Sequence, residues 1–278
     1  MWVKNNNLKI AIIFSLCWVV NIVNAFEPIT NLTSQWWDSA SAAPSYSSSG
    51  AARQGWVNGL DGWFNEEWHV GMTGTNSHEN ASDIFTGFIH IQKRLTRRFA
   101  MGVDLPVIVN NGDDTGIGDF GLTLKGMLYE TQDVSISAGF DTYFATGDKE
   151  HQGGEIWRIT PHIDVFKDLG NAFSFQGGVL LDILPESNSK ADTALTGKFG
   201  FGRTMTSHNA ILGDLTPNMV TTVKVPMGGG ANGNVYVSLT PGIRAHLSGG
   251  YVLLGLEIPV TGPDTFENQA TIMYIRGF

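Results

Sequence analysis

A two-residue alternation of apolar and polar side chains constrains this chain more than any other feature. Between Phe99 and Val109 every odd-numbered residue is apolar, whereas the even-numbered ones include Gly102, Asp104 and Pro106. A period of two is typical of a β-strand with one apolar and one polar face, because successive side chains point to opposite sides. The same alternation recurs in Asp83–Leu95, Phe120–Tyr129, Val134–Phe144, Ile156–Lys167, Phe173–Ile183, Leu195–Phe201, Val235–His246 and Val252–Val260.

The length of these segments separates two classes of all-β protein. Strands of soluble proteins are most often about 5–6 residues long, whereas a tilted strand needs roughly 9–11 residues to cross a membrane. Most of the alternating segments have the longer length. Only 15% of the residues are charged, which is below the roughly 25% of an ordinary soluble domain. A transmembrane β-barrel is therefore favoured, and a soluble β-sandwich is the alternative.

The fold class predicted is all-β: a transmembrane, antiparallel, up-and-down barrel of about 12 strands. We expect the first strand at Trp63–Thr75 and the last at Thr271–Phe278. Ten or fourteen strands are alternatives because Thr206–Val225 is irregular, and Pro217 argues against one regular strand there. Short turns such as Asp168–Asn171 alternate with longer polar loops, which is the pattern of outer-membrane barrels.

A literal G-x-G-x-x-G at Gly116, Gly118 and Gly121 raises the alternative of a nucleotide-binding site. In that fingerprint a helix follows the glycines and holds the pyrophosphate at its N-terminus. Here the alternating segment Phe120–Tyr129 follows instead, with Tyr129 on its polar face. We therefore expect a strand and no cofactor, and we assign the first two glycines to a long loop, Asn110–Gly118.

Residues 1–25 have the features of a secretory leader. Lys4 and Lys9 precede an apolar stretch at Ile10–Val20. A cleavage site is expected between Ala25 and Phe26. The apolar stretch is too short to span a bilayer as a helix. The only cysteine of the sequence lies within this leader, so the mature chain has neither a disulfide nor a catalytic thiol.

The expected organisation has three parts, and the expected location is the bacterial outer membrane. Residues 1–25 form the signal peptide, residues 26–62 an N-terminal periplasmic segment or partial plug, and residues 63–278 the barrel. The formal net charge is −9, and loss of two leader lysines makes the chain more acidic. An acidic chain is a poor nucleic-acid binder, because phosphate contact requires clustered Lys and Arg.

Catalytic and metal sites are not expected. The strand histidines His90, His162 and His246 all lie on polar faces, and no Ser-His pair falls on an apolar face, where a lipid-modifying barrel enzyme would need one. No G-x-S-x-G is present. His162 and Asp164 have the i, i+2 spacing of a strand, but ligating sites need three or four convergent groups. A lipid-modifying enzyme is therefore the weakest of the alternatives.

The polar faces instead place charged side chains of both signs inside the barrel. Mixed charges in a lumen set selectivity for small solutes, so these residues are candidates for lining a pore. The alternative is a structural or surface-binding barrel whose lumen is closed by ion pairs and hydrogen bonds. The candidates are His90, Arg94, Asp104, Lys125, Asp141, Arg158, His162, Asp164, Asp182, Lys198, Lys224, Arg244, His246 and Glu257.

With these residues placed, the chain resembles the MetA-pathway of phenol degradation family of outer-membrane proteins. The resemblance rests on "TGIGDFGLTLKGMLYE" (Thr115–Glu130), "AGFDTYFATGD" (Ala138–Asp148) and "LGLEIPVTGP" (Leu254–Pro263). It covers most of Phe85–Phe278, and it departs from the family at Ala145, where proline is usual. The resemblance implies a channel or transporter for passive uptake of small hydrophobic or aromatic solutes.

The C-terminus adds an expectation about partners. Phe278 shares its parity with Tyr274 and Ile272, and this resembles the aromatic signal by which the barrel-assembly machinery recognises outer-membrane proteins. Arg276 occupies a position on that parity that is usually apolar. The expected partners are therefore outer-membrane lipid, the assembly machinery through Phe278 and a small-molecule solute, with no nucleic acid.

Overall fold

The structure is a computed structural model. It describes residues 45–63, 65–77, 84–96, 98–110, 114–147, 157–184, 193–206, 212–227, 235–247, 249–262 and 266–278. The expected leader, its cleavage site and residues 26–44 lie outside the described residues, so those expectations stay predictions. No helix among the described residues is long and apolar enough to cross a membrane.

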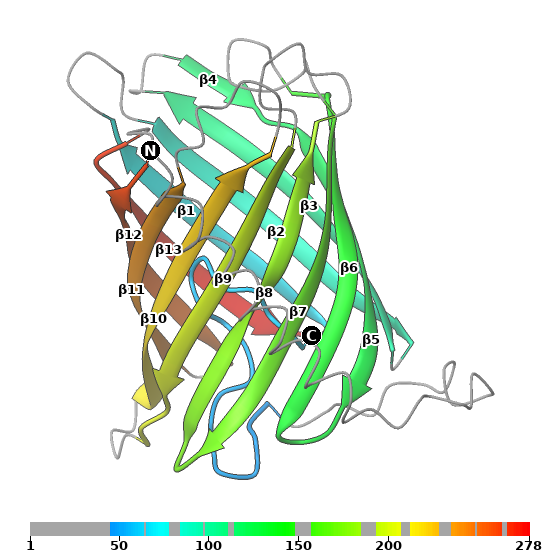
Figure 1. Ribbon diagram of the computed structural model, residues 1–278, viewed down its shortest axis with the longest axis vertical. Coiled ribbons are helices and arrows are strands. Elements are labelled where there is room, and N and C mark those ends of the chain that lie inside the picture. Colours follow the sequence, from blue (N-terminus) through cyan, green and yellow to red (C-terminus); the bar gives the residue numbers. More distant parts are fainter. Residues whose placement is uncertain are drawn as a thin grey trace, which may run out of the picture. The chain divides into compact units, whose positions relative to one another are not determined.

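Twelve antiparallel strands form a closed barrel (Figure 1). Each strand pairs with its neighbours along the chain, and β1 closes the wall by pairing with β13 from Glu67↔Gly277 to Asn76↔Asn268. The strands are β1 (Glu67–Asn76), β2 (Ile84–Thr96), β3 (Phe99–Asn110), β5 (Phe120–Glu130), β6 (Val134–Phe144), β7 (Arg158–Gly170), β8 (Phe173–Ile183), β9 (Thr193–Arg203), β10 (Leu212–Pro226), β11 (Tyr236–Leu247), β12 (Gly250–Thr261) and β13 (Asn268–Gly277). The predicted all-β barrel of about 12 strands is confirmed.

The two faces of the wall differ as the alternation predicts. The register places Met101, Leu124 and Phe140 side by side on three consecutive strands, and Met101 and Phe140 are exposed on the outer face. On the inner face Ser137 pairs with Asp164, and both side chains are fully buried. An apolar outer face with a polar interior is the arrangement that a barrel in lipid requires.

A β-bulge at Leu128 corrects the sequence analysis for one residue. The pairing of β5 with β6 shifts register between Met127 and Tyr129, so the alternation restarts one residue late. Tyr129, expected on the polar face, is instead 36% exposed among the outer hydrophobic residues. The same shift turns Glu130 into the lumen, where its carboxylate accepts a hydrogen bond from Trp63 Nε1 at 3.1 Å.

Within the irregular stretch Thr206–Val225, the residues from Leu212 onward belong to one strand, β10, despite Pro217. Pairing of β10 with β9 runs from Asn218↔Gly202 onward, and beyond the proline only Leu215 pairs with Met205 as an isolated bridge. The missing N–H of Pro217 therefore interrupts the ladder on one side only. Pairing with β11 continues through Pro217↔Ile243, which keeps the strand continuous.

The expected long loop at Asn110–Gly118 also proves to be partly a strand. β4 (Asp114–Ile117) folds back on the end of β3, with Val107↔Ile117 and Asn110↔Asp114 as its outermost pairs. The expected strand after the glycines is confirmed, because β5 begins at Phe120. A short hairpin therefore extends the wall beyond the barrel at this point (Figure 1).

The opposite faces of β5 give a test of the barrel in lipid. We expect Leu124→Arg to destabilise the folded protein by roughly 2–4 kcal/mol, because it places a cation on the outer face near mid-bilayer. Thr123→Arg should cost far less, since Thr123 faces the lumen and already donates to Asp141 Oδ1 at 2.6 Å. Urea titration of protein folded into lipid vesicles measures both values.

The two variants are adjacent in sequence and carry the same substitution, so each is the control of the other. Equal losses of folding free energy at the two positions would contradict an outer face in contact with lipid.

Candidate functional site

The described residues before the wall, 45–63, lie inside the barrel; we call them the lumen segment (Figure 1, blue). Their side chains and backbone contact inner-face residues of β5, β7, β9, β11 and β12. Strands on so many sides can be reached together only from within the lumen. The segment starts at the end with the short turns, where Ser48 N donates to Asp133 Oδ1 at 2.8 Å and Ser49 Oγ donates to Asp168 Oδ1 at 2.7 Å.

Glycines of the inner wall make room for this segment. A Cβ atom at Gly200 would lie 2.6 Å from the ring of Trp56, and one at Gly202 would lie 2.8 Å from the same ring. Three strands further along the wall, a Cβ atom at Gly255 of β12 would lie 2.6 Å from Val57. Any larger side chain at these positions would collide with the segment, so here glycine serves close approach of two parts of the chain.

A second set of contacts holds the later part of the lumen segment. Trp63 is buried against Ala100 and Met127, and it donates to the inward-facing Glu130. The Arg53 guanidinium lies 4.9 Å from the centre of the Trp63 ring and 3.7 Å from Glu130 Oε1. Arg53 therefore combines a cation–π contact with a buried ion pair, which satisfies the charge that burial would otherwise leave unpaired.

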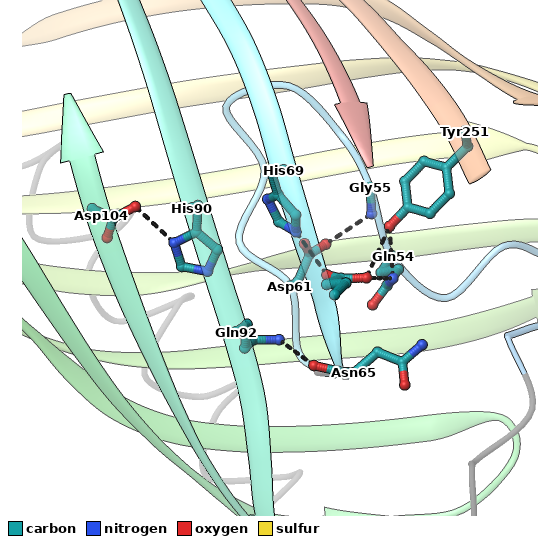
Figure 2. Close-up of polar contacts among 10 residues, drawn as sticks. Gln54, Gly55, Asp61, Asn65, His69, His90, Gln92, Asp104 and Tyr251 are labelled. Carbon is teal, nitrogen blue, oxygen red and sulfur yellow. Dashed lines mark hydrogen bonds and ion pairs between the residues drawn. The ribbon is translucent and has the colours of Figure 1, made fainter. Parts of the chain in front are cut away.

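Polar contacts tie the segment to β1 and β12 (Figure 2). Gln54 Nε2 donates to Glu67 Oε2 and lies equally close, at 2.6 Å, to the Tyr251 hydroxyl. Within the segment Gly55 N donates to Asp61 Oδ1 at 3.2 Å. The other Glu67 oxygen lies 2.9 Å from His69 Nε2, so this carboxylate links the segment, β1 and β12.

Three of the predicted lumen residues form the support beneath Asp61. Lys125 Nζ donates to the backbone oxygen of Asp61 and makes an ion pair with Asp164 at 2.8 Å. Asp164 Oδ2 lies 2.8 Å from His162 Nδ1. Because all three wall side chains are buried, their charges are committed to holding the lumen segment.

Burial changes the acidity of the Asp61 carboxyl group. Burial raises the pKa of Asp61 to about 6, and the nearby Lys125 ammonium opposes this shift. Since the folded pKa lies above the ordinary value, this group stabilises the seated segment below about pH 4 and loses that contribution as the pH rises through about 6. The lumen segment therefore contains one group whose charge works against seating at neutral pH.

Above the lumen segment lies an open cavity of about 520 Å³, which we call the vestibule. It sits at the end of the barrel with the long loops, because Arg158 begins β7 and Pro226 ends β10. Asn58 of the lumen segment donates to Glu257 Oε2 at 2.7 Å, and Glu257 lines the cavity. The vestibule wall includes six predicted lumen residues: Asp141, Arg158, Asp182, Lys198, Lys224 and Glu257.

The other predicted lumen residues lie outside the vestibule. His90 Nδ1 lies 2.7 Å from Asp104 Oδ1, and the His90 ring stands 4.8 Å from that of His69 (Figure 2). Arg244 is buried, with its guanidinium 4.3 Å from the centre of the Tyr251 ring. The last two, Arg94 and His246, lie near the short turns, Arg94 buried and His246 partly buried.

Two glycine-rich motifs of the sequence meet at the long-loop end. The backbone N–H groups of Thr146 and Gly147 both donate to Asp119 Oδ1, at 3.1 and 2.9 Å. In return Thr146 Oγ1 accepts a hydrogen bond from Phe120 N at 2.9 Å. Asp119, just before β5, and Thr146-Gly147, just after β6, therefore form one clasp between adjacent strands.

The residues that sequence reasoning missed belong to the lumen segment and its anchors. Arg53, Gln54 and Asp61 carry no strand periodicity, and Glu130 was hidden by the bulge at Leu128. One signal was present: the pair Gly-Trp occurs at residues 55–56 and again at 62–63. Both tryptophans are buried, and both glycines approach another part of the chain too closely for a side chain.

Among the described residues, no group of three or more His, Cys, Asp or Glu side chains is arranged to hold a metal ion. The buried carboxylate of Asp164 contacts both His162 and the ammonium group of Lys125. These side chains therefore form a charge network around an ammonium group.

No protein-family model matches the chain, and no curated protein sequence is significantly similar to it. Solved structures do match. An outer-membrane channel from Pseudomonas putida F1 has a TM-score of 0.54 at 15% identity, over 78% of this chain and 96% of that one. The NanC porin has a TM-score of 0.52 at 10% identity, over 77% and 98% of the two chains. The KdgM porin has a TM-score of 0.50 at 8% identity, over 76% and 99%.

The fold is that of outer-membrane channel barrels. At these identities the likeness extends to the fold alone.

The position of Asp61 gives a test of how the lumen segment is held. We expect Asp61→Asn to raise the midpoint of thermal unfolding at about pH 7, because it removes a buried charge. At about pH 4 the wild-type carboxyl is protonated in the folded state, so the variant and wild type should differ little. Thermal unfolding of purified protein in detergent at several pH values between these measures the difference.

A difference between Asp61→Asn and wild type that is the same at both ends of the pH range would contradict the assignment.

Proposed function

We propose that this protein is an outer-membrane channel for passive uptake of small solutes. The single observation that carries the proposal is the charged vestibule, a cavity of about 520 Å³ inside a closed barrel. Mixed charges that face a narrow aqueous space set the local concentration of ions and polar solutes. The fold likeness to an outer-membrane channel and two porins supports the same function.

The location proposed with this function is the outer membrane. The apolar outer wall and the predicted leader of residues 1–25 support it. Phe278 is 62% exposed at the end of β13, so its ring is accessible to an assembly machinery that reads a C-terminal aromatic residue.

Mass spectrometry of the mature protein should give an N-terminus at or near Phe26, because the leader is too short to serve as an anchor. The same sample should fractionate with outer membranes. An intact Met1, or protein found only in the soluble periplasm, would exclude this location.

A solute would enter the vestibule from the long-loop end and then meet the lumen segment. The segment occupies part of the lumen, where Trp56 packs against Gly200 on β9 and Val57 against Gly255 on β12. In a barrel of about twelve strands the lumen lies between the filled eight-stranded and the open sixteen-stranded cases. The proposed transport step therefore includes passage around, or displacement of, the lumen segment.

Membership of the MetA-pathway of phenol degradation family, with small hydrophobic or aromatic solutes, is the finer form of this proposal. The clasp between Asp119 and Thr146-Gly147 supports it, because it gives a structural reason for two of the motifs on which the resemblance rests. The aromatic rings of Tyr143, Tyr236 and Phe266 in the vestibule wall also favour such solutes.

A structural or surface-binding barrel with a closed lumen is the second candidate. The observation in its favour is the lumen segment itself, whose Trp56 is buried against β9 and whose Trp63 is buried against β3 and β5. A lipid-modifying enzyme has less support, because His90 and His162 are both paired with aspartates in the lumen, away from the outer face.

Recording of single channels in planar bilayers tests the proposal. We expect discrete conductance steps for wild type and larger or more frequent steps for Trp56→Ala, because this change removes the largest contact between the lumen segment and Gly200 and Gly202. Uptake of uncharged sugars into liposomes should rise in parallel.

Phe201→Ala is the matched control. This aromatic residue lies on the outer face of β9, the strand that carries Gly200 and Gly202, and it is 57% exposed. It should conduct as wild type does. Silent bilayers and impermeable liposomes for wild type and Trp56→Ala alike would leave the closed barrel as the better account.

A further inference from the structure

Two lysines of the vestibule differ from its other charged residues. Lys198 on β9 and Lys224 on β10 both line the cavity. Within the described part of the chain, neither ammonium group makes a hydrogen bond or an ion pair. By contrast, the buried Lys125 is held by Asp164 and by the lumen segment.

The register places these lysines in one compact patch. Lys198 pairs with Thr222, and Thr196 pairs with Lys224, so the four side chains form a square on two adjacent strands. Diagonal positions of such a square are about 7–8 Å apart, within reach of two flexible ammonium groups. The hydroxyl oxygens of Thr196 and Thr222 are buried and also lack a hydrogen-bond partner among the described residues.

The three acidic groups of the vestibule already accept hydrogen bonds, Asp141 from Thr123 Oγ1 at 2.6 Å. Glu257 accepts hydrogen bonds from Ser238 Oγ at 2.6 Å and from Tyr236 and Asn58 at 2.9 and 2.7 Å. Asp182 accepts from Thr160 Oγ1 at 2.9 Å. The third cation, Arg158, lies with its guanidinium 4.1 Å from the centre of the Tyr143 ring. Among the described cations of the vestibule, the two lysines are therefore the ones without a direct partner.

The rest of the cavity limits the kind of anion. Asp182 and Glu257 line the same space and would repel a second negative charge. Tyr143, Tyr236 and Phe266 contribute rings, and Leu180 contributes an aliphatic surface. A cavity of about 520 Å³ falls within the range of small-molecule sites.

We propose that Lys198 and Lys224 form a carboxylate-binding site, which selects small organic monoanions with an apolar or aromatic body. The carboxylate would accept hydrogen bonds from both ammonium groups, and the body would lie against the rings of the vestibule. This assignment rests on the proposed channel function for its biological role, but the site itself can be measured without transport.

Three ring compounds of the same size and different charge are the probes: benzoate, benzyl alcohol and benzylamine. Calorimetric titration of the purified, folded full-length protein in detergent should show benzoate binding about tenfold or more tightly than benzyl alcohol, with no binding of benzylamine. Benzoate binding should weaken as salt is raised, because ions screen the lysine charges.

Lys198→Gln and Lys224→Gln should each weaken benzoate binding by about tenfold, the scale of one lost hydrogen bond to a charged group. The double change to arginine should retain binding because it keeps both positive charges. Lys167→Gln, an exposed position on the outer parity of β7, is the control of equal charge and should bind as wild type does. Circular dichroism and heat-dependent gel mobility report whether each variant is folded.

Equal binding of the three compounds, or benzoate binding that is unchanged in folded Lys198→Gln and Lys224→Gln, would overturn the carboxylate site. Liposome uptake in the same samples separates this from the channel itself. Uptake without preference for benzoate would leave the channel and remove the site. Lysine-dependent binding without any uptake would support the site and refute the channel.

Discussion

Closure of the wall is the constraint on which the rest of the structure depends. β1 and β13 pair along ten residues each, so neither end strand leaves a free edge of unpaired N–H and C=O groups. Once the wall is closed, every strand residue must face either outward or inward. The outward set is apolar, and the inward set brings charged and hydroxyl-bearing side chains into a confined space where each needs a partner.

The lumen segment supplies many of those partners at the short-turn end. Glu130 receives Arg53 and Trp63, and Lys125 receives the backbone of Asp61. Toward the long-loop end, Asn58 of the segment contacts Glu257. The inward-facing charged side chains at that end line a cavity. The barrel is therefore divided along its axis into a filled half and an open half, and only the open half is free to meet a solute.

The wall could be predicted from the sequence because one short rule determines it. Leu124 faces outward and Thr123 inward, as their parity alone indicates. The rule failed where the backbone breaks its own period: the bulge at Leu128 turned Tyr129 outward, and Pro217 interrupted pairing on one side of β10 without ending the strand. Such irregularities depend on how a strand pairs with its neighbours, and the sequence of the strand alone does not carry that information.

The site was less predictable, for a physical reason that Lys125 and Lys198 illustrate. Both have inward parity and both were named as lumen residues, yet one is locked in an ion pair and the other faces open space. The difference comes from the lumen segment, which has no periodicity and covers only one of them. A binding surface in such a barrel is what remains of the polar inner wall after the segment has packed. The charge of that binding surface is therefore set mainly by the inward-facing residues that the lumen segment leaves uncovered. The composition of the wall as a whole matters less.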